Sequence, residues 1–231
     1  MTRFAAALAL SALVALAACG RPLTPEERQV AQELMGDGFN PAPVRIARLG
    51  VVGLREATYP VRPRVTCRER ILPPPEGDTI TGATAGVALF QTLITGPDWF
   101  LDNYAAGYPS RVNLVALMFF AHEMVHIWQW QNRDRTGYHP LKAAAEHKPG
   151  VDPYLFDPED RTPFLEMGFE QQGALVEEYV CCRTLDPDGA RTARLEALLQ
   201  TELDLTPLAR LMPPEETLIP WAGADLEGIC S

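Results

Sequence analysis

The residues best suited to chemistry are two histidines and a glutamate in one short motif. His122, Glu123 and His126 form an HExxH pattern within the segment HEMVH. On a helix, side chains four residues apart lie one above the other, so both imidazoles can bind a single metal ion. The glutamate beside the first histidine can then take a proton from a water on that ion. The motif therefore predicts a metal-dependent hydrolytic site.

The segment around the motif predicts a buried helix. Residues 112–121 have almost no polar face, and we expect the helix to run from Ser110, which can cap it, to about Arg135. Buried histidine and glutamate side chains need polar partners, and a metal ion supplies one. The alternative is structural: the same residues could form the polar stripe of a core helix.

A catalytic zinc ion takes three protein ligands and keeps one position for water, so the motif needs a further ligand. The best acids lie in a second predicted helix, residues 168–183. Glu170 and Glu177 share one face of that helix, together with Ala174 and Cys181. Both glutamates are therefore candidate ligands. The one that does not bind the ion is suited to hold a ligand imidazole by its free N–H.

The two helices together resemble a known family. HEMVHIWQWQ, followed about forty residues later by FEQQGALVEEY, is similar to the zincin-like metallopeptidase domains of the DUF4157 type, and the opening LTPEERQVAQELMGDGFNPAPVRI resembles the start of that domain. The resemblance covers about residues 23–183. It implies that His122, His126 and Glu170 bind Zn²⁺ and that Glu123 is the general base. Gly173 stands where the family usually has alanine.

Supporting residues are expected around this centre. Glu177 is predicted to orient a ligand imidazole, while Glu178 and Tyr179 fall where the family has Asp-Tyr. A second donor usually stabilises the oxyanion of such a reaction. Tyr154, His139 and Tyr179 are candidates. Tyr154 is preferred because the long loop of residues 137–163 can fold over the cleft.

The rest of the chain predicts an α+β fold. We expect a helix at 24–35 that opens with a capping box, a strand at 44–49 and an edge strand at 61–67. One or two short strands are expected within 79–94, and helices at 141–147 and 190–203. The resemblance then implies a minimal zincin-like domain over residues 24–185. Its small mixed or antiparallel sheet would pack on the motif helix and the ligand-bearing helix, with a C-terminal helix and tail at 186–231 packed on the domain.

The N-terminal segment predicts export and lipidation. Residues 1–18 combine a positive start with a short apolar stretch, which is typical of a signal peptide rather than a membrane-spanning helix. The ending Leu-Ala-Ala-Cys resembles a bacterial lipobox, which implies acylation of Cys19, with residues 19–23 as a tether. The resemblance places the protein in the cell envelope, facing the periplasm and on the outer membrane. The alternative is an ordinary signal peptide.

The four remaining cysteines are expected to form disulfides, because exported proteins occupy oxidising compartments. They are Cys67, Cys181, Cys182 and Cys230. A bond between the neighbours 181 and 182 would form a strained ring, so we expect one of them to join Cys67 and the other to join Cys230. The alternative is a thiolate metal site, although the pairs lack CxxC spacing.

Composition limits the remaining possibilities. The chain has 231 residues, 47% hydrophobic composition and a formal net charge of −10, which suits one domain with a full core and argues against a nucleic-acid partner. We expect a monomer that acts on a peptide or protein substrate. A zinc hydrolase acting on cell-wall peptides and a non-catalytic zinc-containing envelope lipoprotein are the competing interpretations. Glu123 favours catalysis, since a structural site needs no base there.

Overall fold

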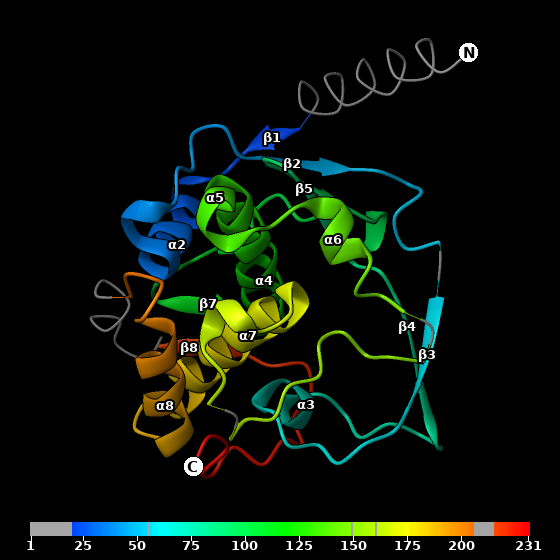
Figure 1. The fold of residues 1–231 in the computed structure, drawn as a ribbon. Helices are drawn as coiled ribbons and strands as arrows, with labels where there is room; N and C mark the ends of the chain where they lie inside the picture. The colour runs from blue at the N-terminus through cyan, green and yellow to red at the C-terminus, as the bar shows by residue number, and fades with distance from the viewer. Residues whose placement is uncertain (1–19, 55, 149, 160, 206–214) are drawn as a thin grey trace.

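A small mixed sheet forms one side of the molecule (Figure 1). The computed structural model describes residues 20–54, 56–148, 150–159, 161–205 and 215–231. The sheet order is β1 (Arg21–Pro22), β2 (Arg45–Arg48), β6 (Thr92–Thr95) and β5 (Gly86–Leu89). β2 and β6 are parallel, whereas β1–β2 and β5–β6 are antiparallel. The predicted α+β class with a small mixed sheet is confirmed.

Two long helices form the centre of the fold. α4 (Leu114–Gln131) lies between the sheet and α7 (Phe169–Leu185) in Figure 1. Trp128 and Phe120 of α4 are completely buried, as the apolar sequence predicted. Because α4 is covered on several sides, its polar side chains are held in the interior rather than on a solvated stripe.

The motif helix begins later than predicted. Ser110 does not cap it; Asn113 does, and its Oδ1 accepts from Ala116 N at 3.3 Å. The preceding residues form β7 (Arg111–Asn113), which pairs in parallel with β8 (Glu216–Leu218). α4 ends at Gln131, and α5 (Arg133–Thr136) follows as a separate turn. This pairing with a distant strand is not visible in local sequence.

α2 (Pro25–Met35) confirms the predicted capping box. The Thr24 hydroxyl accepts from Glu27 N at 3.2 Å, and the Glu27 carboxylate accepts from Thr24 N at 2.9 Å. Glu27 is buried, and its carboxylate also pairs with the Arg21 guanidinium at 2.7 Å. The start of α2 is therefore fixed to β1.

The predicted edge strand at 61–67 is wrong. The strands of this region are β3 (Glu56–Pro60) and β4 (Thr79–Ala83), which pair antiparallel as a two-stranded ribbon. Thr66 instead caps α3 (Cys67–Ile71), because its side chain accepts from Glu69 N and Glu69 reaches back to Thr66 N. The Thr-x-x-Glu pattern was present in the sequence and outweighs the β-branched residues beside it.

The remaining elements are short. They are 3₁₀ turns at Gly36–Gly38, Pro97–Trp99 and Phe164–Glu166, and helices α6 (Pro140–Ala144) and α8 (Ala190–Leu199). α6 ends before the predicted residue 147, and α8 ends before the predicted residue 203. α8 packs against α7, so the C-terminal part of the chain contacts the ligand-bearing helix.

Two disulfides tie distant segments to α7. Cys67 of α3 joins Cys181, and Cys230 near the C-terminus joins Cys182. The predicted arrangement, with one helix cysteine for each partner, is confirmed. Its consequence is that α3 and the C-terminal tail are both fixed to the second half of α7.

Removing the Cys182–Cys230 bond should destabilise the fold. The bond joins residues 48 apart, and its chain-entropy contribution is about 4 kcal/mol. We expect the Cys182→Ala/Cys230→Ala variant to lose about 2–4 kcal/mol of unfolding free energy in urea denaturation, with the other bond verified by a thiol count. An unchanged midpoint would show that the tail contributes no constraint.

The stretch expected to act as a tether is part of the folded body. Arg21 and Pro22 form β1, and Leu23 is buried, so residues 21–23 are held against β2. Cys19 and the predicted signal peptide lie outside the described residues. Within the described part of the chain, no helix is both long and apolar enough to cross a membrane.

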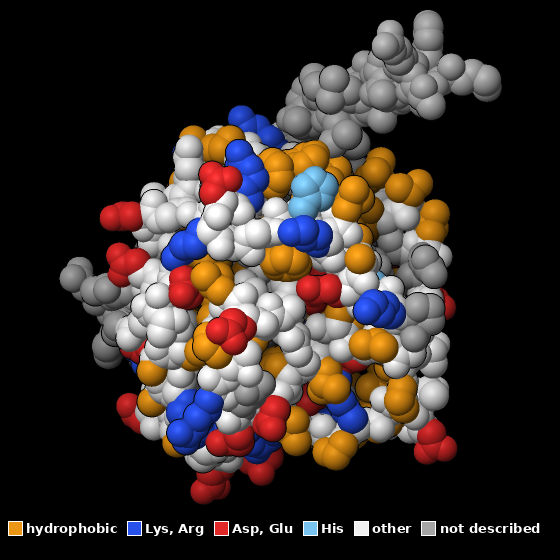
Figure 2. Space-filling model, viewed as in Figure 1, with side chains coloured by type: hydrophobic (Ala, Val, Ile, Leu, Met, Phe, Trp, Pro, Cys, Tyr) orange, Lys and Arg blue, Asp and Glu red, His pale blue; other side chains and the backbone are white. Residues whose placement is uncertain are grey.

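The surface has an uneven distribution of apolar side chains. On the face shown in Figure 2, acidic and basic side chains are interspersed over the middle and lower parts. Hydrophobic side chains gather along the upper margin, over the loop that follows β2 in Figure 1. Exposed apolar side chains that cluster in one region often mark a surface that binds another protein, a ligand or a membrane.

Candidate metal centre

Three buried donor atoms from α4 and α7 form a compact triangle. His122 Nε2 and His126 Nε2 lie 3.2 Å apart, and each lies 3.3 Å from Glu170 Oε2. All three residues are at least 90% buried. This buried group could bind a metal ion. The two predicted helices thus bring together the three predicted ligands.

Glu170 is positioned by the start of α7. The Glu146 carboxylate accepts from Phe169 N at 2.9 Å and from Glu170 N at 3.0 Å, so it satisfies two backbone groups of the first turn. A negative charge at a helix N-terminus is also favourable for the helix dipole. The segment after α6 therefore fixes the backbone that carries Glu170.

His126 is held in one orientation by its neighbours. Its Nδ1 lies 2.9 Å from Gln129 Oε1, which can only accept, so Nδ1 carries the proton and Nε2 is left to bind a cation. The Gln129 amide nitrogen donates to Gln172 Oε1 at 2.9 Å, which fixes the orientation of Gln129. The Tyr138 ring stacks on the His126 ring at 5.8 Å between centroids.

His122 has a carboxylate behind it. Its Nδ1 lies 3.6 Å from Glu177 Oε2, and the same oxygen accepts from Arg68 Nη1 at 3.0 Å. Glu177 therefore lies where the sequence predicted, on the far side of the imidazole from the donor triangle. The arrangement favours a proton on Nδ1 and leaves Nε2 to the triangle.

The charges of this centre depend strongly on one another. Burial lowers the pKa of His122, but the carboxylates of Glu170 and Glu177 outweigh it and raise the pKa to about 10. Burial raises the pKa of Glu170, yet the imidazoles around it hold its pKa well below the usual range. Without a cation the His122 and His126 imidazoles, whose pKa values are both raised, hold protons that a metal ion must displace.

Gly173 is required by the position of His122. A Cβ at residue 173 would lie 2.7 Å from His122 Cε1 and 2.8 Å from both ring nitrogens. Such contacts are closer than atoms can approach without displacement. The glycine that departs from the resembled family pattern therefore gives the imidazole its space against α7.

Gly173→Ala should weaken metal binding although it improves helix propensity. The added methyl group would displace the His122 ring, and disturbing a ligand's support typically costs about 10- to 100-fold in metal affinity. Competition with a chromophoric chelator measures this affinity. Gly82→Ala is the matched control, since a Cβ there meets nothing within 4 Å. Equal affinities in both variants would refute the steric role.

Glu123 lies beside the triangle with one oxygen unsatisfied. The residue is 6% exposed, and its Oε2 has no hydrogen-bond partner among the described residues. β5 comes close to the other oxygen: a Cβ on Gly86 would lie 3.0 Å from Glu123 Oε1. Burial raises the pKa of Glu123, while the imidazoles of His122 and His126 lower it, and the net shift is upward. This carboxylate can therefore accept and release a proton.

The long loop supplies two further groups. Tyr154 packs against His122, with 5.6 Å between ring centroids, so the preferred loop residue does reach the site. His147 Nε2 lies 3.0 Å from Glu170 Oε1, the oxygen outside the triangle. Sequence reasoning did not place His147 in the site. Two features of the sequence pointed weakly to a role for His147. It is one of only four histidines, and it follows Glu146 in a loop expected to cover the cleft.

Three other candidates point elsewhere. Both Glu178 oxygens accept from Cys67 N, at 2.9 and 2.8 Å, and Glu178 Oε1 also accepts from Arg191. The Tyr179 hydroxyl donates to Glu196 of α8 at 3.3 Å. His139 caps α6 and is exposed. Glu178 therefore stabilises α3, and neither Tyr179 nor His139 is directed at the donor triangle.

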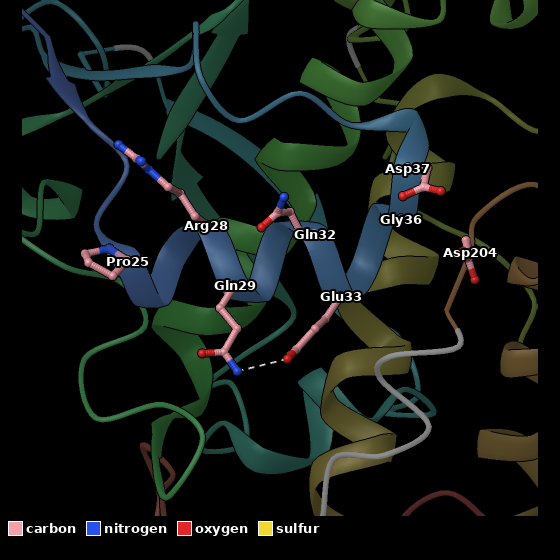
Figure 3. Close-up of a pocket in the computed structure, with 8 residues that line it drawn as sticks. All are labelled: Pro25, Arg28, Gln29, Gln32, Glu33, Gly36, Asp37 and Asp204. Atoms are coloured by element: carbon pink, nitrogen blue, oxygen red, sulfur yellow. Dashed lines mark hydrogen bonds between the residues drawn. The ribbon is translucent and has the colours of Figure 1, made fainter.

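A surface cavity lies apart from this centre. It has a volume of about 370 Å³ and runs along the outer face of α2 (Figure 3). Its lining residues are Pro25, Arg28, Gln29, Gln32, Glu33, Gly36, Asp37 and Asp204. None of them is a predicted site residue, so the donor triangle and not this hollow is the candidate functional site.

Comparison with known proteins supports the fold. The chain is similar to the effector domain of Pseudomonas aeruginosa VgrG2b, with a TM-score of 0.52, 20% sequence identity, and coverage of 83% of this chain and 95% of that one. No family model and no curated protein matches the chain. Similarity at this level of identity establishes a shared fold alone, and membership of the resembled DUF4157-type family stays a prediction.

Proposed function

We propose that the protein is a zinc-dependent peptidase of the bacterial cell envelope. The observation that carries this proposal is the donor triangle, with edges of 3.2, 3.3 and 3.3 Å. Ligands at about 2.0–2.1 Å from a tetrahedral zinc ion lie roughly 3.3–3.4 Å from one another. The triangle therefore has the size that three zinc ligands require, and a zinc ion held there would supply a bound water for hydrolysis.

The donor set fits Zn²⁺ chemically. Imidazole nitrogens combined with a carboxylate oxygen suit zinc better than the harder cations, which prefer oxygen donors alone. A zinc ion bound by His122, His126 and Glu170 would act as a Lewis acid and increase the acidity of its water. The unsatisfied Glu123 Oε2 is a second observation in favour of a bound group, since buried carboxylate oxygens rarely lack a partner.

Glu123 is suited to move the proton of the reaction. Its carboxylate accepts a proton from the attacking water and then donates it to the amine that leaves when the peptide bond breaks.

Tyr154 and His147 are placed to assist. Burial and the Glu170 carboxylate raise the pKa of Tyr154, so its hydroxyl stays protonated and can donate to an oxyanion. His147 holds the outer oxygen of Glu170 and thereby directs the inner oxygen to the triangle. Both residues come from the segment between α6 and α7.

The strand beside the site supports a peptide as the proposed substrate. β5 is the last strand in the sheet order, and among the described residues it pairs only with β6. Its free edge can accept an extended peptide by backbone hydrogen bonds, next to Glu123. The lipobox-like sequence at Cys19 supports the proposal that the protein acts on a membrane of the cell envelope, on a peptide or protein substrate.

Cleavage of a peptide library tests the proposal. The purified protein would be incubated with peptides from a digested bacterial proteome, and new termini would be identified by mass spectrometry. We expect new termini that disappear with a chelator and return with zinc. Stoichiometric zinc without any new termini would instead favour the non-catalytic zinc module.

A further inference from the structure

In the sequence, the predicted lipid anchor immediately precedes the first strand of the sheet. β1 begins at Arg21, two residues after Cys19, and Arg21 is paired with Ile46 of β2. Two residues span at most about 7 Å. If Cys19 is acylated, as the proposed function assumes, the membrane surface must lie directly against this end of the molecule.

Two loops next to β1 form one surface with it. Arg21 Nη2 donates to Leu101 O at 2.8 Å, which attaches the segment after β6 to β1. Leu49 N donates to Thr95 O at 2.9 Å, and Val52 O lies against Gly96, so the loop after β2 packs on the same segment. The anchoring end and both loops therefore form a single surface.

This surface exposes large apolar side chains. Leu54 is 76% exposed, Val51 is 65% exposed, and Trp99 and Leu101 are each 39% exposed. Figure 2 shows hydrophobic side chains along the upper margin of the molecule, over the loop that follows β2 in Figure 1. Side chains of this kind, with tryptophan at the boundary, insert into the headgroup region of a bilayer.

An exposed basic side chain lies within the same surface. Arg48 is exposed, and its guanidinium carbon lies 6.0 Å from the centre of the Phe100 ring. The Arg21 guanidinium is instead paired with the buried Glu27 carboxylate and donates to Leu101 O, so it holds the segment after β6 in place. Asp98 and Asp102 are also exposed in this segment, so contact with lipid depends on the apolar side chains and the anchor rather than on net charge.

We propose that this anchor-proximal face, formed by Arg48, Val51, Leu54, Trp99 and Leu101, lies on the lipid bilayer. The acylated Cys19 holds the protein at the membrane, and the face determines its orientation there. The apolar side chains enter the headgroup region, while the Arg48 guanidinium binds a lipid phosphate. The peptidase is thereby fixed in one orientation rather than swinging on a flexible tether.

Tryptophan fluorescence tests this orientation in the lipidated full chain. The protein would be reconstituted in vesicles of phosphatidylethanolamine and phosphatidylglycerol, with bromine on the acyl chains near the headgroups as a quencher. We expect bromine to quench the wild type, and Trp99→Phe to lose more than half of that quenching. Trp221→Phe is the matched control and should retain it. Equal quenching in wild type and Trp99→Phe would overturn the proposal.

A second comparison separates the face from the anchor. Val51→Ser/Leu54→Ser should reduce the quenching of Trp99, whereas Ile80→Ser, an exposed apolar position on β4, should leave it unchanged. The mass of the N-terminal peptide reports acylation, and peptide cleavage reports the site. If Cys19 is found unacylated, both the lipid anchor and the membrane contact of this face are wrong, whereas the proposed peptidase activity is unaffected. If Trp99 is not quenched and dimers are cross-linked at that position, the face binds a second copy of this chain instead of a membrane.

Discussion

Glu123→Gln is expected to bind zinc as the wild type does and to hydrolyse peptides about 10²- to 10⁴-fold more slowly. The substitution keeps the size of the side chain but removes its ability to accept a proton. Glu123 is not part of the donor triangle, so the metal ligands are unchanged. The measurement is the rate of cleavage of one peptide from the library, together with metal content of the same preparation.

The control for this variant is a glutamate of similar burial with another role. Glu178→Gln removes a carboxylate that holds α3 through Cys67 N, so it should lower stability while a folded preparation keeps most of its activity. Full activity in Glu123→Gln would remove Glu123 from the mechanism. Loss of zinc in that variant would show that Glu123 is a ligand rather than a base.

Glu170→Ala is expected to abolish stoichiometric zinc binding and, with it, all hydrolysis. Glu170 Oε2 is the only donor of the triangle that comes from α7, and without it two imidazoles remain to hold the ion. Two ligands are insufficient for a catalytic zinc site. Elemental analysis of the purified variant measures the loss, and circular dichroism verifies that the fold persists.

Glu196→Ala provides the comparison for this second variant. Glu196 also lies against α7, but it accepts from the Tyr179 hydroxyl on the side facing α8. We expect it to retain one zinc ion per chain. Retention of zinc in both variants would mean that another residue, such as Glu177 or His147, completes the site.

The motif and its partner helix were predictable because each depends on local sequence. The spacing of His122 and His126 fixes their common direction on any helix, and the apolar residues around them require burial. The choice of Glu170 over Glu177 came from a family resemblance. The structure gives it a physical basis, since Glu170 is in the first turn of α7 and Glu177 lies behind His122.

Other features depend on contacts that the sequence does not display. β7 pairs with β8 about 100 residues away, so the true start of α4 at Leu114 was hidden. His147 reaches Glu170 because Glu146 docks on the start of α7, which is a tertiary event. The sequence shows Gly173 as a departure from the alanine of the resembled family. The structure gives the reason for a glycine there, because the His122 ring lies too close to leave room for a Cβ.

The misread strand at 61–67 has a different cause. Val61 and Val65 favour extended structure, whereas Thr66 and Glu69 form a capping box that starts α3. The helix is only five residues long, and its position is fixed by the Cys67–Cys181 bond and by Glu178. Tertiary anchoring of this kind outweighs local propensity in short elements.

X-ray absorption at the zinc edge reports directly which atoms surround the ion. We predict one zinc per chain with a shell of nitrogen and oxygen at about 2.0–2.1 Å and no sulfur. That shell should be lost in Glu170→Ala. A preparation without stoichiometric zinc, or a shell dominated by sulfur at about 2.3 Å from the cysteines, would contradict it.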